Sequence, residues 1–477
     1  MPPPIIVFGA FDRHNFGDLL FAHVAEAMLV QAGVDPARLH FAGLASRDLR
    51  PVGGHAVQAL DAVVARLSET RASAAAVRPA PRGPSGSSVG PGTSDGPGAP
   101  SAILLHAGGE LLACDAWQAA VMLQSPDGLQ ALLHHFASRP AERRAWVRAT
   151  VGTGEQMPYV VSRTRLPAHA HVLHLGVGGV DLDRLARAPR AEVLRKLARA
   201  DGVSVRDATT RAHLAGAAID ALLIPDPAVM VAELFPDRIG LPGHTPGHAP
   251  GHAPGIPIGA HAGAHVGTPS GSDPMGAAFA RGYLAVQFSA DFGDDATLDT
   301  IAAQLDAVAA ATGLGIVFFR AGAAPWHDAL EPYQRVAARM RTDATHVFES
   351  LDPWAICALI AHSRGFCGSS LHGRIVAAAC ARPRVTLCRA EPAGAADSVG
   401  APTKHAAYVD TWDRSVARAL VTAGGLAAAV REALGTDPDV LRTTATALAA
   451  QFRSGFARLL AETPPLADAP SLAAPRA

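Results

Sequence analysis

The sequence contains little cysteine and no excess of charge of either sign. Its 477 residues include five cysteines, and none of them forms a CxxC pair. An odd, scattered set of this kind is a poor disulfide framework and indicates buried thiols in a reducing compartment. The 41 lysines and arginines balance the 42 aspartates and glutamates. This balance gives no electrostatic reason to expect nucleic acid or an anionic membrane as the main partner.

Long apolar runs and a leader segment are also missing. No apolar run reaches the roughly 20 residues that a membrane span requires. The first residues, Met1 to Phe8, lack the basic region and the long apolar stretch of a signal peptide. We therefore expect a cytoplasmic protein with at most peripheral membrane association.

Apolar residues make up 49% of the chain, which is enough for sizeable cores. Short, continuously apolar runs alternate with amphipathic ones, a pattern typical of parallel sheets covered on both faces by helices. The pattern occurs twice, so the predicted fold class is α/β, with two Rossmann-like doubly wound domains facing a cleft and a C-terminal helical tail. We expect an N-terminal domain over 1–237, a linker over 238–277, a C-terminal domain over 278–408 and the tail over 409–477. Residues 72–100 and the end of the tail are expected to be disordered.

The linker is rich in Gly, His and Pro and carries a short repeat, with histidines at His244, His248 and His252. Regularly spaced histidines are compatible with metal binding. The alternative is a flexible linker that happens to be rich in histidine. We favour the linker, because a mobile tract lacks the neighbouring groups that orient good metal ligands.

In doubly wound sheets, ligands bind near the carboxyl ends of the strands. Asn15, Gly17 and Asp18 follow the first predicted strand, in a turn where backbone N–H groups could approach a ligand. Alternatively, Asn15 and Asp18 simply cap the following helix.

Gly108, Gly109 and Glu110 follow a strand predicted at 103–106. Paired glycines would allow a ligand to approach closely, and Glu110 could act as a base or bind a sugar hydroxyl. A tight turn with a solvated carboxylate is the alternative.

Arg206 and Asp207 end another predicted strand. The planar guanidinium of Arg206 could clamp a phosphate or a carboxylate, whereas Asp207 could cap the next helix. A surface pairing of the two residues is the alternative. Farther along, Pro225, Asp226 and Pro227 fix the backbone sharply after a strand, and their role could be purely to turn the chain.

Ser369, Ser370, His372, Gly373 and Arg374 lie where a short strand passes into a helix. The hydroxyls and N–H groups could form an anion cradle. An imidazole at this position could exchange a proton near neutral pH, although a lone histidine is more often a satisfied core residue.

Taken in order, these motifs resemble those of the polysaccharide pyruvyl transferase family, over about residues 5–390. The resemblance implies a pair of Rossmann-like domains of the glycosyltransferase-B (GT-B) type. It also implies transfer of pyruvate from phosphoenolpyruvate onto two hydroxyls of a saccharide or lipid-linked saccharide, giving a cyclic ketal and phosphate. Arg206 and His372 match residues that the family associates with phosphoenolpyruvate. The scheme requires no metal and no cofactor beyond this donor substrate.

The predicted site therefore has two catalytic residues, Arg206 and His372, and a larger set that binds substrate. That set is Asn15, Gly17, Asp18, Gly108, Gly109, Glu110, Asp207, Ser369, Ser370, Gly373 and Arg374. Many family members carry an arginine where this chain has Ser370, and we take Arg374 as a hypothetical substitute for that charge. A glycosyltransferase of the same architecture that uses a nucleotide sugar, or a non-catalytic relative, are the alternative functions.

Overall fold

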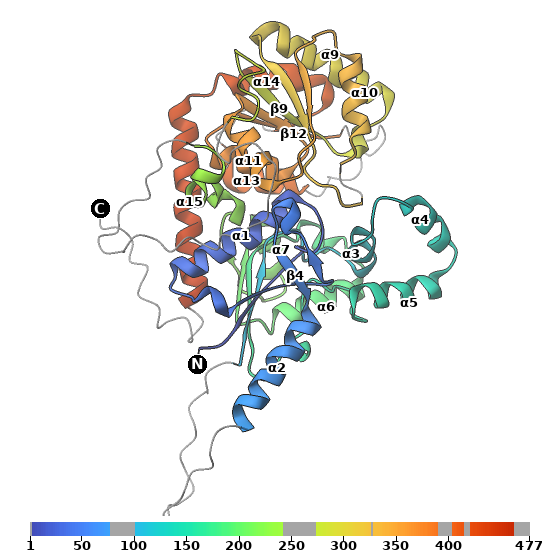
Figure 1. The fold of residues 1–477 in the computed structure, drawn as a ribbon, viewed down its shortest axis with the longest axis vertical. Helices are drawn as coiled ribbons and strands as arrows, with labels where there is room; N and C mark the ends of the chain where they lie inside the picture. The colour runs from blue at the N-terminus through green and yellow to red at the C-terminus, as the bar shows by residue number, and fades with distance from the viewer. Residues whose placement is uncertain are drawn as a thin grey trace, which may run out of the picture.

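The computed structural model describes residues 2–76, 101–241, 273–325, 328–389, 403–414 and 420–461. These residues form two parallel sheets, each covered by helices, in two domains joined along one side (Figure 1). Most of the low-complexity stretch (77–100), most of the His-rich linker (242–272) and the end of the chain (462–477) lie outside the described residues. Within the described ranges, no helix combines the length and the apolar character needed to cross a membrane.

The N-terminal sheet has eight strands in the order β3-β4-β2-β1-β5-β6-β7-β8. All neighbouring strands are parallel except β3 and β4, which are antiparallel. The strands are β1 (Ile5–Phe8), β2 (Leu39–Gly43), β3 (Arg47–Asp48), β4 (Ala56–Ala59), β5 (Ile103–Ala107), β6 (His171–Val177), β7 (Gly202–Val205) and β8 (Leu222–Leu223).

Helices flank this sheet, and α4 and α5 project from it as a hairpin (Figure 1). The helices are α1 (Phe16–Gln31), α2 (Leu60–Ala76), α3 (Ala116–Met122), α4 (Leu129–Ala137), α5 (Pro140–Val151), α6 (Arg187–Leu197), α7 (Ala208–Ala215) and α8 (Val231–Leu234). Two short 3-10 helices, η4 (Val180–Asp183) and η5 (Pro227–Met230), follow β6 and β8.

The C-terminal sheet has six parallel strands in the order β11-β10-β9-β12-β13-β14. They are β9 (Tyr283–Gln287), β10 (Gly315–Phe319), β11 (Thr345–Phe348), β12 (Gly365–Gly368), β13 (Arg384–Leu387) and β14 (Leu420–Val421). Its helices are α9 (Asp295–Thr312), α10 (Glu331–Arg339), α11 (Pro353–His362), α12 (Leu371–Ala379), α13 (Lys404–Trp412), α14 (Leu426–Leu434) and α15 (Pro438–Ala461).

The prediction of two doubly wound α/β domains is confirmed. The continuously apolar strands β1, β5, β9 and β10 are buried at every position, because helices cover both faces of each sheet. The sequence pattern missed the strands β2, β3, β4, β11 and β14, which are short or contain polar residues. Two of these, β4 and β11, are partly exposed and contain polar residues.

The C-terminal region is mainly helical, as predicted, but it belongs to both domains. Strand β14 pairs with β13, and α14 packs against the C-terminal sheet, so the second domain extends beyond the predicted boundary at residue 408. Helix α15 then returns to the first domain and contacts β6, β7 and β8 (Figure 1).

The carboxyl edges of the two sheets face each other. His14, just before α1, lies against loops of the C-terminal domain. Its carbonyl accepts hydrogen bonds from the amides of Ala323 (3.1 Å) and Ala324 (3.2 Å), and its Nε2 lies 2.6 Å from the carbonyl of Leu351. One continuous apolar core includes side chains of α1, α11, α12 and α15. The loops after the strands of the two domains are thereby held together.

The return of α15 to the N-terminal domain depends on a glycine. A Cβ at Gly455 would lie 2.1 Å from Cγ2 of Ile224, which follows β8. We expect Gly455→Val to destabilise the fold by roughly 1–3 kcal/mol, because overpacking a filled contact is costly. Thermal unfolding would measure this loss. Gly435→Val is the matched control, because Gly435 is exposed and a Cβ there meets its nearest atom only at 3.4 Å. Equal Tm values for the two variants would contradict the prediction.

Candidate active site

Five polar side chains from distant parts of the sequence meet between the two sheets. Asp18, Glu110, Arg206 and Asp226 follow strands of the N-terminal domain or begin the next helix, and His372 lies in the first turn of α12. Ion pairs link Glu110, Arg206, Asp226 and His372. This arrangement agrees with the expectation that polar groups gather at the carboxyl ends of the strands.

Arg206 is the central cation of this cluster. Its Nη2 lies 2.7 Å from Glu110 Oε2, and its Nη1 lies 2.9 Å from Asp226 Oδ2. Only 3% of the side chain is exposed. Burial alone would lower the pKa of Arg206, but the carboxylates around it, first of all Glu110, raise it above the usual value. The guanidinium therefore carries its charge at any physiological pH.

Asp226 connects this arginine to the histidine of the other domain. Its Oδ2 bonds to Arg206 and also lies 3.9 Å from His372 Nε2. Its Oδ1 accepts a hydrogen bond from the amide of Ala228 at 3.0 Å. Burial raises the pKa of Asp226, and Arg206 opposes that shift. The sequence interpretation of this position as a simple backbone turn is incomplete, and a lone acid held between two prolines after a strand was the available signal.

The side chain of His372 packs against the first turns of α1 in the N-terminal domain. Its ring is edge-on to Phe21, with centroids 5.1 Å apart, and to Phe16 at 6.3 Å. A Cβ at Gly17 would lie 1.9 Å from His372 Nδ1. The glycine is therefore needed to admit the imidazole ring, a steric role that differs from the predicted contact with substrate.

The serines before His372 hold the turn that presents it. Ser370 caps α12 by accepting a hydrogen bond from the amide of Gly373 at 3.1 Å. Ser369 Oγ accepts one from the amide of Ser289 at 2.9 Å, and its carbonyl oxygen lies 2.9 Å from Nε2 of His405. Burial lowers the pKa of His405 to about 3, so this ring is neutral. The hydroxyl groups that were expected to form an anion cradle therefore already make hydrogen bonds within the C-terminal domain.

Arg374 does not face this cluster, which disagrees with the hypothesis that it supplies donor charge. Its side chain is fully buried, its Nη2 lies 2.5 Å from Asp413 Oδ2, and its Nη1 donates to Thr386 Oγ1 at 3.2 Å. Arg384 binds the same aspartate. On a helix, positions two residues apart point in different directions, so Arg374 turns into the C-terminal domain while His372 turns out of it.

The glycine turn after β5 packs against Asp18, the acid that α1 contributes to the cluster. Gly108 and Gly109 adopt positive φ angles of 62° and 77°, and a Cβ at Gly109 would lie 3.2 Å from Asp18 Oδ1. Asn15 caps α1 through the amide of Gly17 at 3.2 Å. Burial raises the pKa of Asp18, and Arg13, at 3.6 Å, opposes that shift most strongly.

Glu110 and Asp207 differ in whether their carboxylates could contact a ligand. Both oxygens of Asp207 bind Thr210, through its amide at 2.7 Å and its hydroxyl at 2.9 Å, so this residue caps α7. Glu110 accepts the amide of Val180 at 2.7 Å and pairs with Arg206. With 24% of its side chain exposed, Glu110 is more accessible than Arg206 or Asp226.

Two further cations near the cluster were missed by the sequence analysis. Arg13 donates to the hydroxyl of Tyr159 at 2.8 Å and lies over that ring, 5.1 Å from its centroid. Lys404, exposed at the start of α13, lowers the pKa of Asp18 by its charge, after Arg13 and Arg206. Arg13 lies two residues before Asn15, which was a usable signal. Lys404 follows a low-complexity stretch, and no sequence motif pointed to it.

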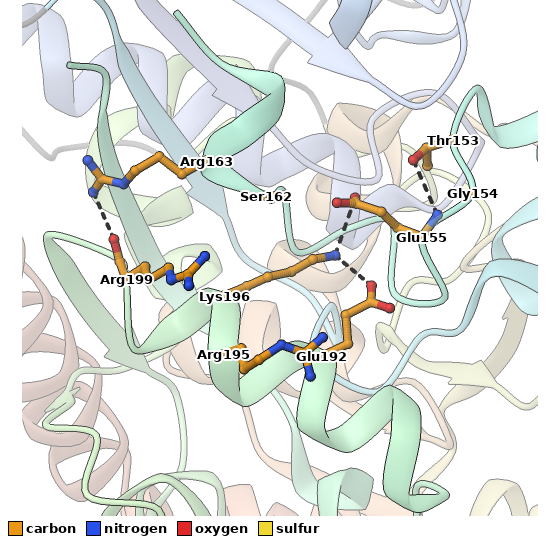
Figure 2. Close-up of a pocket in the computed structure, with 9 residues that line it drawn as sticks. All are labelled: Thr153, Gly154, Glu155, Ser162, Arg163, Glu192, Arg195, Lys196 and Arg199. Atoms are coloured by element: carbon orange, nitrogen blue, oxygen red, sulfur yellow. Dashed lines mark hydrogen bonds and ion pairs between the residues drawn. The ribbon is translucent and has the colours of Figure 1, made fainter. Parts of the chain in front are cut away.

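A separate surface pocket of about 520 Å³ lies elsewhere on the N-terminal domain (Figure 2). It is lined by Thr153, Gly154, Glu155, Ser162, Arg163, Glu192, Arg195, Lys196 and Arg199. Lys196 pairs there with Glu192 at 2.7 Å and with Glu155 at 3.2 Å. Because Arg199 lies just before the start of β7, the pocket belongs to the amino-terminal edge of the sheet. None of the residues of the cluster lines it, so we do not place the active site there.

The fold and the cluster define a two-domain α/β protein with its candidate site at the domain interface. The family model described as polysaccharide pyruvyl transferase matches residues 176–387, as the ordered motifs predicted. The matched range contains Arg206, Asp226 and His372. Asp18 and Glu110 lie before it but join the same cluster.

The chain is also similar to solved structures at low identity. One is the UDP-GlcNAc 2-epimerase of Methanocaldococcus jannaschii, with 10% identity, 91% of this chain and 94% of that chain covered, and a TM-score of 0.45. Another UDP-N-acetylglucosamine 2-epimerase has 10% identity, 99% coverage of both chains and a TM-score of 0.47. The trehalose 6-phosphate synthase of Burkholderia multivorans has 13% identity, 65% and 68% coverage and a TM-score of 0.36. No curated protein matches the sequence significantly.

The contact between Gly17 and His372 can be tested by a double-mutant cycle. We expect Gly17→Ala to lower the free energy of unfolding by roughly 1–3 kcal/mol, because the new methyl group overlaps the imidazole ring. In a His372→Ala background the same substitution should cost much less, since the overlapping ring is gone. Denaturant unfolding of the four proteins gives the coupling. Purely additive effects would show that the two residues do not constrain each other.

His106, which lies on β5 two residues before Gly108, is a structural residue. Its Nε2 accepts a hydrogen bond from the amide of Val161 at 3.1 Å, and its Nδ1 lies 3.2 Å from the carbonyl of Leu173. The ring stacks on His174 at 3.9 Å. Burial lowers the pKa of His106 to about 3. The neutral ring is thus held with both nitrogens in use.

This lowered pKa predicts acid sensitivity. In the unfolded chain the imidazole takes up a proton below its ordinary pKa of about 6.5, whereas the folded ring stays neutral until about pH 3. Stability from this group is present above pH 6.5 and is lost as the pH falls. We expect a loss of roughly 2 kcal/mol at pH 5. Urea unfolding at several pH values should show a shallower decline for His106→Asn than for the exposed control His134→Asn. Parallel declines would contradict the assignment.

Proposed function

We propose that this protein transfers pyruvate from phosphoenolpyruvate onto two hydroxyls of a saccharide in polysaccharide biosynthesis, forming a cyclic ketal and releasing phosphate. The observation that carries the proposal is the meeting of Arg206 and His372, from different domains, at the single carboxylate of Asp226. The family match over residues 176–387 supports a transferase of this kind.

The reaction requires three proton movements and one leaving group. C3 of the donor gains a proton and becomes the methyl group, while both acceptor hydroxyls lose theirs as they bond to C2. The bond between C2 and the phosphate oxygen breaks, and phosphate leaves with the second of the two hydroxyl protons. An imidazole can deliver and collect protons near neutral pH, so we assign this exchange to His372.

Arg206 has the charge and the geometry to bind the carboxylate or the phosphate of the donor. A guanidinium offers paired donors to either group. In the present arrangement it faces Glu110 and Asp226, so an incoming anion would compete with Glu110, the more exposed of the two. Glu110, once displaced, is well placed to accept a hydrogen bond from an acceptor hydroxyl.

A trianionic donor needs more positive charge than Arg206 supplies. Arg374 is bound to Asp413 and is not available for this purpose. Arg13 and Lys404 both act on Asp18, so they lie within electrostatic reach of the cluster. We propose that these two cations provide the charge that family members obtain from an arginine at the position of Ser370.

Asp226 acts as a positioning residue in this scheme. It is fully buried, and its Oδ2 lies 3.9 Å from Nε2 of His372. Its ion pair with Arg206 and its proximity to His372 keep the guanidinium and the imidazole in fixed relative positions. This fixed geometry lowers the entropy cost of aligning donor and acceptor.

Phosphate release from phosphoenolpyruvate in the presence of candidate saccharide and lipid-linked saccharide acceptors tests the proposal. We expect release to depend on acceptor and to fall about 100-fold or more in His372→Ala, since a proton-transferring group typically contributes that much. Arg206→Lys should also lose activity, because lysine keeps the charge but not the fork of donors. Lys404→Ala should mainly raise KM for the donor.

Arg195→Ala is the matched control, because Arg195 lines the distant surface pocket and its loss should leave the rate unchanged. Folded His372→Ala protein with full activity would refute the assignment of the histidine. Tight binding of a nucleoside diphosphate, without binding of phosphoenolpyruvate, would instead favour a nucleotide-sugar glycosyltransferase.

A further inference from the structure

Three side chains with metal-ligating atoms converge outside the candidate active site. They are His23, Glu26 and His55, and one potential ligand atom of each lies within 4.8 Å of the other two. His23 and Glu26 are three residues apart on α1, so they share one face of the helix. His55 immediately precedes β4. All three are half-buried.

The hydrogen bonds around His23 leave one ring nitrogen with a lone pair. His23 Nε2 lies 2.8 Å from the carbonyl oxygen of Gly53. Since a carbonyl can only accept, Nε2 carries the proton and Nδ1 does not. Metal-binding histidines typically donate their other ring N–H to a carbonyl in this way.

His55 has a buried nitrogen without a hydrogen-bond partner. Its Nε2 lies 3.0 Å from Glu26 Oε2, while its Nδ1 is buried and meets no partner among the residues that the structure describes. A buried polar atom left in this state is uncommon in native proteins and calls for an explanation, such as an ion.

Aromatic and charged groups from several elements surround the three side chains. The ring centroids of His55 and Phe41 lie 4.0 Å apart, and those of His23 and Trp354 on α11 lie 4.9 Å apart. Arg238 lies over Trp354 and acts electrostatically on His23. The acidic Asp352, at the start of α11, acts on Arg238 in turn. The apolar walls limit the access of water and strengthen a metal–ligand bond.

We propose that His23, Glu26 and His55 bind a zinc ion, with water completing a tetrahedral site. Two imidazoles and one carboxylate form a ligand set that suits Zn²⁺. The ion would join α1 to the segment before β4, beside α11 of the other domain. Helix α1 also carries Gly17, against which His372 packs, so the site would stabilise the helix that supports the active site without taking part in the reaction.

Zinc binding by the full chain tests this proposal. Protein freed of metal by a chelator is titrated with Zn²⁺ alone, and bound equivalents are counted after dialysis. We expect Glu26→Gln and His55→Ala each to bind one equivalent fewer than the unaltered chain. Zinc should raise the Tm of the unaltered chain, since binding to the folded state stabilises it, and should raise it less in either variant. Cobalt should give the visible absorption of a tetrahedral site only when all three ligands are present.

The His-rich linker could bind zinc independently, so it supplies the matched control. A variant with His244, His248 and His252 changed to alanine should keep the equivalent that depends on His55. Circular dichroism confirms that each variant is folded, and Glu26→Gln is the variant with the smallest change in shape. The proposal is wrong if folded Glu26→Gln and His55→Ala bind as many equivalents as the unaltered chain, or if the linker variant binds none.

Discussion

The contact between the His372 ring and the backbone of Gly17 constrains both domains at once. The ring belongs to α12, while the glycine begins α1, and a side chain at position 17 would occupy the space of the imidazole. The start of α1 is in turn held by the Asn15 cap and by the bonds of His14 to the second domain. The position of the histidine is therefore set by the domain interface itself, and the domains could not separate without changing the site.

The buried carboxylate of Asp226 also links the two domains, because it lies near Arg206 of the first and His372 of the second. Removing one partner of a buried ion pair leaves an uncompensated charge and costs about 3–5 kcal/mol. Arg206 avoids this cost by facing two acids, Asp226 and Glu110. An anionic substrate could replace the more exposed Glu110 while the bond to Asp226 persists. Under the proposed function, the group that balances charge in the free protein would also recognise the anion.

Much of the fold could be predicted from the sequence, because continuously apolar strands separated by helices leave few alternatives to parallel sheets. The order of the motifs also placed Arg206 and His372 at one site. What could not be predicted depends on side-chain direction. Helix α12 begins at Leu371, so both His372 and Arg374 lie within it. Residues two apart on a helix face different directions, so Arg374 does not share the face of His372. It pairs instead with Asp413, which is 39 residues away in the sequence and which no sequence motif linked to it.

The glycines of the motifs show why the ordered series is more informative than its parts. A Cβ at Gly17 would meet His372, one at Gly178 would lie 2.5 Å from Glu110 Oε2, and one at Gly108 would lie 2.3 Å from the ring of Phe21. At each of these three glycines, the space that a Cβ would need is occupied by a side chain that is distant in the sequence. The contact of Gly17 with His372 joins the two domains, while the other two lie within the N-terminal domain. A change at one of these glycines would therefore disturb a residue that is distant in the sequence.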